Sequence, residues 1–382
     1  MIIAENTCCG CSACEAICPK HCIEIKKDSE GFDYPKIRTE ECVHCGQCNA
    51  VCPAVQGDIH KLKDKIVAYA AYSKEIGRLC SSSGGIFGEL AEHILKQNGV
   101  IYGAAFEEDF MGVEHCRIEN IRGLEQLRGS KYLQSSMKNC YKQAQKDLQE
   151  GKIVLFSGTA CQIAGLKNYL NKEYEKLYTI DVLCHGTPSP LAWKQYLSRI
   201  EQKYGSKPVA INMRDKRNGW KEFGTSIQFE NGRCYYKEHS SDLFMNAFLD
   251  NYSLRQSCYK CRFTSLYRAS DLTIGDAWNI DDVFSDMNDG KGVSVILTRS
   301  EKGEKLINEN KKNLIIRVAD VDSLLPPNSG GRKASPMNPR RVEFFEQLQS
   351  GENAFRMAQE PFWVRAKTKI KKRLRALKHG KI

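Results

Sequence analysis

The chain has 382 residues, a length typical of two or three domains, and no apolar run of 18 residues that would cross a bilayer. Its 18 cysteines would indicate disulfides in a small secreted protein, but no apolar signal segment precedes them. We therefore expect a soluble cytoplasmic protein whose cysteines are metal ligands or redox groups. The net charge is +11, but residues 361–382 alone contain nine Lys or Arg and no acidic residue, so the rest of the chain is nearly neutral. The basic character is therefore confined to the tail, and we expect no nucleic-acid partner.

Two cysteine runs near the start of the chain share the spacing Cys-x2-Cys-x2-Cys-x3-Cys-Pro. Bacterial ferredoxins with two 4Fe–4S clusters have this spacing, and the fourth cysteine of each run ligates the other cluster. One cluster is therefore assigned to Cys8, Cys11, Cys14 and Cys52, and the other to Cys42, Cys45, Cys48 and Cys18. Structural zinc usually takes two ligand pairs with a longer spacer, which fits two complete runs poorly. Cys9 and Cys22 fall outside the spacing, and we expect neither to be a ligand.

Two short strand-like runs lie between the cysteine runs. Residues 23–26 and 32–35 flank Gly31, and this pattern predicts a β-hairpin. Residues 1–60 are therefore expected to form an α+β ferredoxin-like module with two 4Fe–4S clusters.

Beyond a polar linker at residues 57–65, short apolar runs alternate with longer amphipathic ones. Strands are expected at residues 66–72, 100–106, 153–156 and 177–183, and helices at residues 84–95, 136–148, 162–170 and 191–204. This alternation predicts an α/β domain, whose first part spans residues 66–205. The second part, residues 206–335, has more strand character, and residues 336–382 form a basic tail.

Three loops lie at strand ends or helix starts, where α/β proteins bind ligands. Residues 81–85 read SSSGG, and such small residues before a helix allow backbone amides to approach a phosphate, although they also cap ordinary helices. Residues 156–162 and 183–189 each follow a strand, and each contains a cysteine, Cys161 or Cys184. A buried structural thiol is the alternative for either cysteine alone.

A single CxxC motif, Cys258 to Cys261, follows farther along the chain. Alone it fits a dithiol or half of a zinc site. Together with Cys161 and Cys184 it provides four thiols, which are enough for a third 4Fe–4S cluster.

Several short motifs occur in a fixed order in the second domain. They are SSSGG, GSKY at residues 129–132, GTACQ, CHGTPS, RDK with GW at residues 214–220, CxxC and GDAW at residues 275–278. This series resembles the β-subunit family of coenzyme F-420 (deazaflavin) hydrogenases and dehydrogenases, and chlorophyll-cycle hydroxymethyl reductases are in the same flavoprotein group. The resemblance covers about residues 66–325 and implies an α/β flavoprotein domain that binds FAD beside a 4Fe–4S cluster. Ala160 departs from the family pattern, which has Pro between the Thr and the Cys.

The resemblance also implies roles for individual residues. The flavin would be contacted by Ser82, Ser83, Gly84, Gly85, Gly129, Ser130, Lys131 and Tyr132, and its ring lined by Thr159, His185, Gly186 and Thr187. Cys161, Cys184, Cys258 and Cys261 would hold the third cluster. Lys131 is the candidate to stabilise the reduced ring and His185 the candidate proton donor, although a structural Lys or His fits the sequence equally well. Surface salt bridges are the simpler interpretation of the RDK and GDAW segments.

These features favour an iron–sulfur flavoprotein oxidoreductase. Iron–sulfur clusters pass single electrons, whereas organic substrates usually need two, and FAD converts between the two. We expect electrons to be exchanged between a donor or acceptor protein, such as reduced ferredoxin, and a small-molecule substrate. Bacterial relatives with this architecture occur without the deazaflavin coenzyme and resemble enzymes found beside surface-polysaccharide genes, which would imply a sugar-related or glycan-precursor redox step. The alternative is a non-catalytic electron-transfer subunit that delivers electrons to a partner enzyme.

The C-terminal residues 361–382 have the pattern of a cationic amphipathic helix. Apolar residues recur at steps of three and four, at Trp363, Ala366, Ile370, Leu374 and Leu377. Lysines and arginines lie between them. Such a helix can lie on an anionic membrane surface, so we expect a peripheral contact with the inner membrane face. A solvated tail, or a helix that binds an acidic partner, is the alternative.

Overall fold

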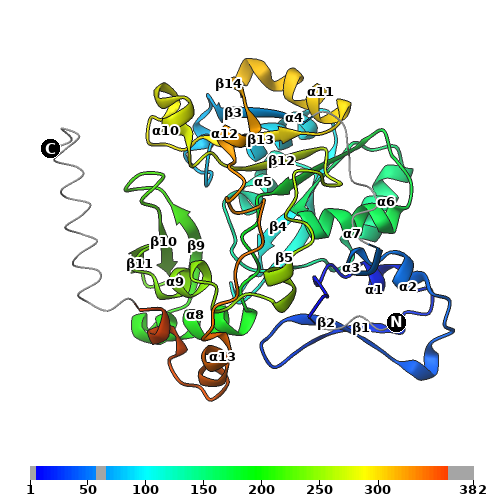
Figure 1. The fold of residues 1–382 in the computed structure, drawn as a ribbon, viewed down its shortest axis with the longest axis vertical. Helices are drawn as coiled ribbons and strands as arrows, with labels where there is room; N and C mark the ends of the chain where they lie inside the picture. The colour runs from blue at the N-terminus through cyan, green and yellow to red at the C-terminus, as the bar shows by residue number, and fades with distance from the viewer. Residues whose placement is uncertain (1–5, 57–65, 360–382) are drawn as a thin grey trace.

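The computed structural model describes residues 6–56 and 66–359 as a mixed α/β protein (Figure 1). The linker expected at residues 57–65 and the amphipathic helix expected at residues 361–382 fall outside the described residues. Among the helices that the structure describes, none is both long and apolar enough to span a membrane.

The N-terminal module consists of one hairpin and three short helices. The hairpin pairs β1 (Ile23–Lys27) with β2 (Asp33–Ile37) in antiparallel register, and the helices are α1 (Ala13–Ile17), α2 (Gln47–Ala50) and α3 (Pro53–Gln56). The Asp28 carboxylate accepts the backbone N–H of Phe32 at 2.8 Å and closes the turn, in which Gly31 has a φ of 87°. The expected hairpin is therefore confirmed, and the left-handed turn residue explains the need for glycine.

A nine-stranded mixed sheet forms the centre of the second domain. Its strands, in spatial order, are β14 (Leu314–Ala319), β3 (Val67–Ser73), β13 (Ser294–Thr298), β12 (Leu272–Asp276), β8 (Leu177–Val182), β7 (Val154–Thr159), β4 (Val100–Phe106), β5 (Val113–Ile118) and β6 (Ser135–Ser136). The central strands β12, β8, β7 and β4 are parallel to their neighbours within this group, and antiparallel strands flank them. The carboxyl ends of these parallel strands therefore lie along one edge of the sheet.

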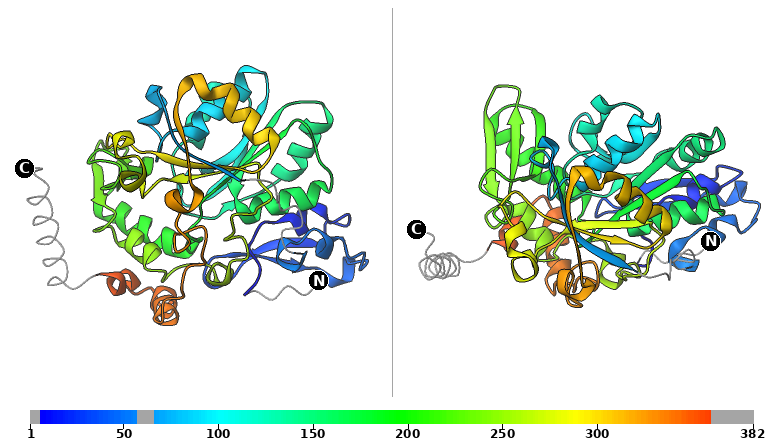
Figure 2. Two further views of the ribbon diagram at one scale, coloured as in Figure 1. Left: turned by 45° about the horizontal axis from the view of Figure 1, so that its top comes forward. Right: turned by 90° about the horizontal axis from the view of Figure 1, so that it is seen from above.

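Helices cover both faces of this sheet (Figure 2). The helices α4 (Ile86–Lys96), α5 (Ile121–Leu127) and α11 (Glu301–Asn310) share one apolar cluster with Ile101 and Leu155 of the sheet. The helices α6 (Cys140–Gln149) and α7 (Ala160–Leu170) share another cluster with Tyr102 and Phe156 on the opposite face. Successive residues of a strand point to opposite faces, so each of these strands contributes to both layers.

The N-terminal module packs on the α6 and α7 side of the sheet. Cys11, Ala13 and Val51 belong to the same buried cluster as Tyr141 of α6 and Ile163 of α7. The module is therefore attached to the second domain through its own cysteine-bearing loops.

The expected strands and helices of residues 66–205 are confirmed, with two differences. Ser135 and Ser136 form β6, so α6 begins at Cys140 rather than at residue 136. The serines at residues 81–83, which were available to cap the next helix, do not do so, because α4 follows Gly85 at a φ of 84° and no side chain caps it. The hydroxyl of Ser83 instead donates to the backbone oxygen of Val293.

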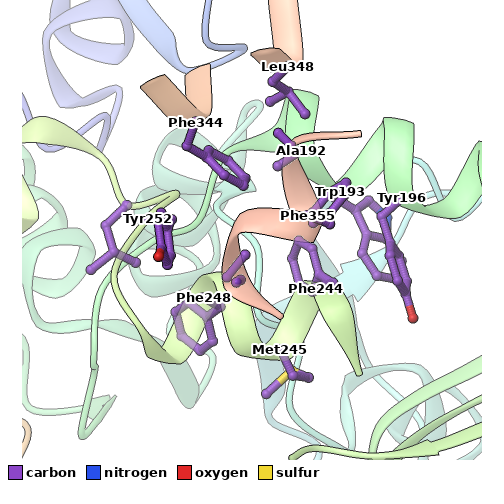
Figure 3. Close-up of a cluster of buried hydrophobic side chains, with 14 of the residues drawn as sticks. Ala192, Trp193, Tyr196, Phe244, Met245, Phe248, Tyr252, Phe344, Leu348 and Phe355 are labelled. Atoms are coloured by element: carbon purple, nitrogen blue, oxygen red, sulfur yellow. The ribbon is translucent and has the colours of Figure 1, made fainter. Parts of the chain in front are cut away.

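A second, smaller subdomain surrounds a three-stranded antiparallel sheet. Its elements are β9 (Pro208–Asp215), β10 (Gly224–Phe229), β11 (Cys234–Glu238), α8 (Pro190–Tyr204), α9 (Leu243–Leu249) and α13 (Arg341–Gln349). Two further short helices, α10 (Ile280–Val283) and α12 (Val321–Leu324), lie outside this subdomain and pack near β3 of the large sheet. Figure 3 shows the aromatic cluster between α8, α9 and the C-terminal segment. Phe344 and Phe355 are fully buried there, so part of the expected tail, residues 336–359, belongs to the folded core.

Asp181 anchors the end of β8 to the neighbouring strand and to the segment after the CxxC motif. Its carboxylate is fully buried and accepts hydrogen bonds from Arg268 at 2.9 Å and from Thr273 at 2.6 Å. Ser270 donates the third bond at 2.8 Å. Because Cys184 lies three residues beyond Asp181, this network fixes the loop that carries that thiol.

We expect Asp181→Asn to lower the free energy of unfolding by about 3 to 5 kcal/mol, because it leaves the Arg268 charge buried without its partner. Denaturant unfolding of the anaerobic protein, followed by circular dichroism, measures the change. Asp286→Asn is the matched control, since Asp286 pairs with Arg317 at the surface and should have little effect. Equal effects of the two substitutions would show that the Asp181 network is not important for stability.

Candidate functional site

The first set of cysteines lines a single cavity in the N-terminal module. Cys8, Cys11, Cys14 and Cys52 all border one small cavity, together with Gly10 and Asp33. All four are buried, and desolvation raises the pKa of Cys14 to about 12. A proton is therefore held on this thiol unless a metal replaces it. The structure thus brings together the four cysteines that the spacing assigned to one cluster.

The second set lies at the outer end of the module. Cys18, Cys42 and Cys48 gather around Ile23 and Ile37. Cys45, from the same run, is exposed at the surface. This set therefore lies nearer to solvent than the first.

A fifth thiol lies within the second set. Cys22 is buried, and its Sγ is 3.5 Å from the Sγ of Cys18. In the part of the chain that the structure describes, no three His, Cys, Asp or Glu side chains are arranged to hold a single metal ion.

The third set of cysteines comes together from three separate segments. Cys161 lies in the first turn of α7, Cys184 follows β8, and Cys258 and Cys261 belong to a 3-10 turn at Gln256–Lys260 and its end. Burial, together with the charges of the other three thiols, raises the pKa of Cys184 well above its usual range. The four cysteines therefore lie close enough to interact electrostatically, as the sequence motifs implied.

Neighbouring parallel strands explain part of this arrangement. β7 and β8 pair in parallel, so the residues after them emerge at the same edge of the sheet. The CxxC segment is attached beside them by a bridge between Pro188 and Leu254 and by a bond from the backbone N–H of Thr187 to the Sγ of Cys258 at 3.4 Å. Thr159, expected at the flavin ring, caps α7 in a capping box with Gln162 and contacts the Sγ of Cys161 at 3.1 Å, and its contact with a flavin stays a prediction.

The first and third sets both involve α7, which carries Cys161 and packs against Cys11. A Cβ on Gly165 of this helix would be 3.0 Å from the Sγ of Cys11, so glycine allows a close approach that a larger residue would crowd. The thiol of Cys9 interacts with both Cys11 and Cys161. Sequence spacing identified Cys9 only as a non-ligand, whereas the structure places it between the two sets.

The two motifs expected to contact a flavin are neighbours in the structure. The backbone N–H of Ser130 donates to the Oγ of Ser82 at 2.6 Å. Lys216 donates to the backbone oxygen of Ser83 at 3.1 Å. Gly129 has a φ of 79°, and no atom lies within 4 Å of the position of a Cβ there. The SSSGG and GSKY motifs therefore form one half-buried surface with open space at Gly129.

The Gly84 and Gly85 pair of the first motif is held tightly by the sheet. The backbone N–H of Gly84 donates to the Oγ of Ser294, and a Cβ at Gly84 would lie 2.6 Å from the backbone oxygen of Ala71. Gly84 is therefore needed for close packing, independently of any ligand.

Lys131 is held among neutral groups at this surface. Its Nζ donates to the backbone oxygens of Arg128 and Gly129 at 2.8 and 3.3 Å. Desolvation lowers the pKa of Lys131 to about 7, and the nearby Cys116 opposes this shift. The amine therefore changes its charge near neutral pH.

His185 and Tyr132 contact opposite parts of one aromatic ring. The Phe248 ring centroid is 5.1 Å from that of Tyr132 and 5.0 Å from that of His185. Burial lowers the pKa of His185, and its Nε2 is buried without a hydrogen-bond partner. The structure thus brings the GSKY motif near the CHGTPS loop, and the Nε2 of His185 in that loop has no hydrogen-bond partner.

The backbone beside His185 is closely packed. Gly186 has a φ of 148°, and a Cβ there would lie 2.8 Å from a methyl group of Leu254. The backbone of Thr187 accepts the N–H of Arg255 and donates to Cys258. Gly186 and Thr187 therefore contact the CxxC segment.

Arg214 of the RDK segment and Asp276 of the GDAW segment form a largely buried pair, so the interpretation of a surface salt bridge is wrong for these two residues. Asp215, in contrast, does pair near the surface with Arg217. Arg214 is 4% exposed and donates to the carboxylate of Asp276 at 2.6 Å, and Trp220 donates to the same carboxylate at 2.8 Å. The ring of Trp220 stacks on that of Trp278 at 5.1 Å, and Arg214 lies 3.5 Å from the hydroxyl of Tyr132. The fixed order of these motifs with GSKY is the sequence signal for this network.

Two family models match the chain. Residues 7–55 match the 4Fe–4S dicluster domain, and residues 151–323 match the C terminus of the coenzyme F420 hydrogenase/dehydrogenase beta subunit. A chain of the xenon-derivatised F420-reducing NiFe hydrogenase complex from Methanosarcina barkeri is 14% identical, with a TM-score of 0.45, over 78% of this chain and 91% of that chain. No curated protein gives a significant sequence match.

We expect Lys131 to become reactive toward acetic anhydride near pH 7, because burial favours its neutral amine. Competitive labelling from about pH 5 to about pH 11, followed by peptide mass spectrometry, gives the titration of each lysine against the usual value of about 10.4. Lys216, whose pKa burial lowers to about 8, should follow next. If Lys131 becomes reactive only at the pH at which the exposed lysines do, its amine is not desolvated, which would contradict the expectation.

Proposed function

We propose that this chain is an iron–sulfur flavoprotein oxidoreductase, because residues 151–323 match the C terminus of the coenzyme F420 hydrogenase/dehydrogenase beta subunit and residues 7–55 match a 4Fe–4S dicluster domain. It exchanges electrons between a protein partner and a small organic substrate. FAD, when bound, supplies the conversion between one-electron and two-electron chemistry. The observation that carries the proposal is the convergence of four cysteines beside the first set of the dicluster domain.

A third 4Fe–4S cluster fits the convergent cysteines. Cys161, Cys184, Cys258 and Cys261 supply the four thiolates that such a cluster takes. Their surroundings are buried and apolar, with Ala164 and Phe263 in contact. The N–H of Thr187 donates to the Sγ of Cys258, and hydrogen bonds of this kind raise the potential of a cluster.

The surface formed by the SSSGG and GSKY motifs supports a flavin site. Gly129 leaves room for a ligand next to its backbone, and Lys131 provides a donor whose charge changes near neutral pH. We assign Lys131 the role of neutralising negative charge on bound FAD. The same motifs, with Tyr132, would hold the cofactor next to the third set of cysteines.

His185 is the group that we assign to proton transfer. Its Nε2 has no hydrogen-bond partner in the protein, so a bound molecule can satisfy it. A depressed pKa keeps the ring neutral, and a neutral imidazole can accept a proton at Nε2 and return it.

The outer end of the dicluster domain is the proposed contact for the partner protein. Cys45 is exposed and Val43 is 57% exposed, whereas the first set of cysteines is buried against α7. An exposed cluster ligand allows a redox partner to approach closely, and such partners typically form small interfaces.

Two substrate classes are proposed on the basis of the resemblance. A deazaflavin is one candidate, and a sugar-related precursor of a surface polysaccharide is the other. Cytoplasmic location at the inner membrane face would fit the second, through residues 361–382, which lie outside the described residues.

A non-catalytic electron-transfer subunit is the competing function, and the name of the matched family, a β subunit, favours it. In that case the chain would deliver electrons to a partner enzyme. Steady turnover of a small molecule by the isolated chain with reduced ferredoxin separates the two functions.

Anaerobic purification with iron, sulfide and flavin quantified together tests the proposal. Three clusters predict about twelve irons per chain, with one FAD. Cys258→Ala should remove about four irons, because a cluster lacking one thiolate is lost, and should leave about eight. Cys234→Ala is the matched control, since this exposed cysteine lies on β11.

Eight irons and no flavin in the unmodified protein would contradict the proposal. The chain would then be a ferredoxin module joined to a domain with a different function. Equal iron in the Cys258→Ala protein would show that the third set holds no cluster.

A further inference from the structure

We infer that the buried guanidinium of Arg255 balances the negative charge of the clusters held by the first and third cysteine sets, and that it raises the reduction potentials of these clusters. This inference rests on the proposed function, because it requires clusters in both sets. Arg255 is a positioning residue: it touches the loops that carry the ligands and does not itself ligate iron.

Arg255 is a buried charge with only neutral hydrogen-bond acceptors. Its side chain is 1% exposed. The guanidinium donates to the backbone oxygens of Cys8 and Asp33, both at 2.7 Å, and to the side-chain oxygen of Gln134 at 2.9 Å. Its remaining contact is with aromatic rings, since it lies 4.1 Å above the centre of Tyr34.

No carboxylate neutralises this charge. Among the ion pairs formed by the described residues, none includes Arg255, whereas the buried Arg214, Arg268 and Arg341 each pair with a carboxylate. An isolated buried charge is costly, so a folded protein normally provides an opposite charge close by. The expected anion is therefore a group other than a side-chain carboxylate.

The groups that surround Arg255 belong to both cysteine sets. Cys8 of the first set and Cys258 of the third set lie near enough to interact with its charge, and Cys9 lies beside them. A 4Fe–4S cluster with four thiolates carries a net charge of about −2 in its oxidised form. Two such clusters would supply the missing anion.

The backbone of Arg255 connects the same two sets. Its N–H donates to the backbone oxygen of Thr187, and its own oxygen accepts the N–H of Cys258. The main chain of Arg255 therefore holds the CxxC turn while its side chain holds the Cys8 loop. Gly10 permits this arrangement, because a Cβ there would lie 2.9 Å from Nη1 of Arg255.

A fixed cation between the sets has a definite electrostatic consequence. Reduction adds one negative charge to a cluster, and a nearby positive charge stabilises the reduced form more than the oxidised form. Arg255 therefore raises the potential of both clusters. It also keeps them at a constant separation, because it is bonded to the loops of both.

The test is an anaerobic redox titration followed by electron paramagnetic resonance, on the full chain with its clusters assembled. Arg255→Met should lower the equilibrium constant for reduction of the clusters of both sets, each about tenfold, or about 59 mV for a one-electron couple. Arg255→Lys retains the charge and should recover most of the shift. Arg341→Gln is the matched control, because Arg341 also joins the N-terminal module to the second domain but pairs with Glu30.

Each outcome decides the question. Unchanged potentials in an iron-replete Arg255→Met protein would overturn the inference. If Arg255→Met loses iron while Arg255→Lys keeps it, the need for charge is supported. Equal loss in both would show that shape rather than charge matters, and would overturn the inference. Absence of a third cluster from the unmodified protein would instead contradict the proposed function.

Discussion

The close contact between the Cys11 loop and α7 is the constraint on which the arrangement of the sites depends. α7 begins at the carboxyl end of β7, carries Cys161 in its first turn and presents Gly165 one turn later. Cys11 packs closely against Gly165, where an added Cβ would lie 3.0 Å from the Cys11 Sγ. One helix therefore positions a member of the third cysteine set and also supports the first set, which brings two separately folded cysteine sets next to each other.

Local features of the sequence predicted much of this structure. The spacing of the two N-terminal runs, the hairpin at Gly31 and the alternating strands and helices depend on residues a few positions apart, and the structure confirms the hairpin and the alternation. Because β7 and β8 are parallel neighbours, the expected proximity of Cys161 and Cys184 also followed from short-range patterns.

Features that depend on distant contacts could not be predicted from the sequence. Arg255 binds the Cys8 backbone oxygen across 247 positions, and nothing near Arg255 distinguishes it from a surface arginine. The same is true of Arg214, whose partner Asp276 lies 62 positions away, and of Phe355, which packs into the core from a segment expected to be a basic tail. These contacts are set by the tertiary fold.

The central claim is that electrons pass between the dicluster domain and a flavin through the third cysteine set. The most direct measurement is the rate at which bound flavin loses its absorbance after anaerobic mixing with reduced ferredoxin, in the unmodified protein and in Cys258→Ala. The account predicts that the variant still accepts electrons into its N-terminal clusters but loses rapid flavin reduction. Flavin reduction at the same rate in both proteins would contradict it.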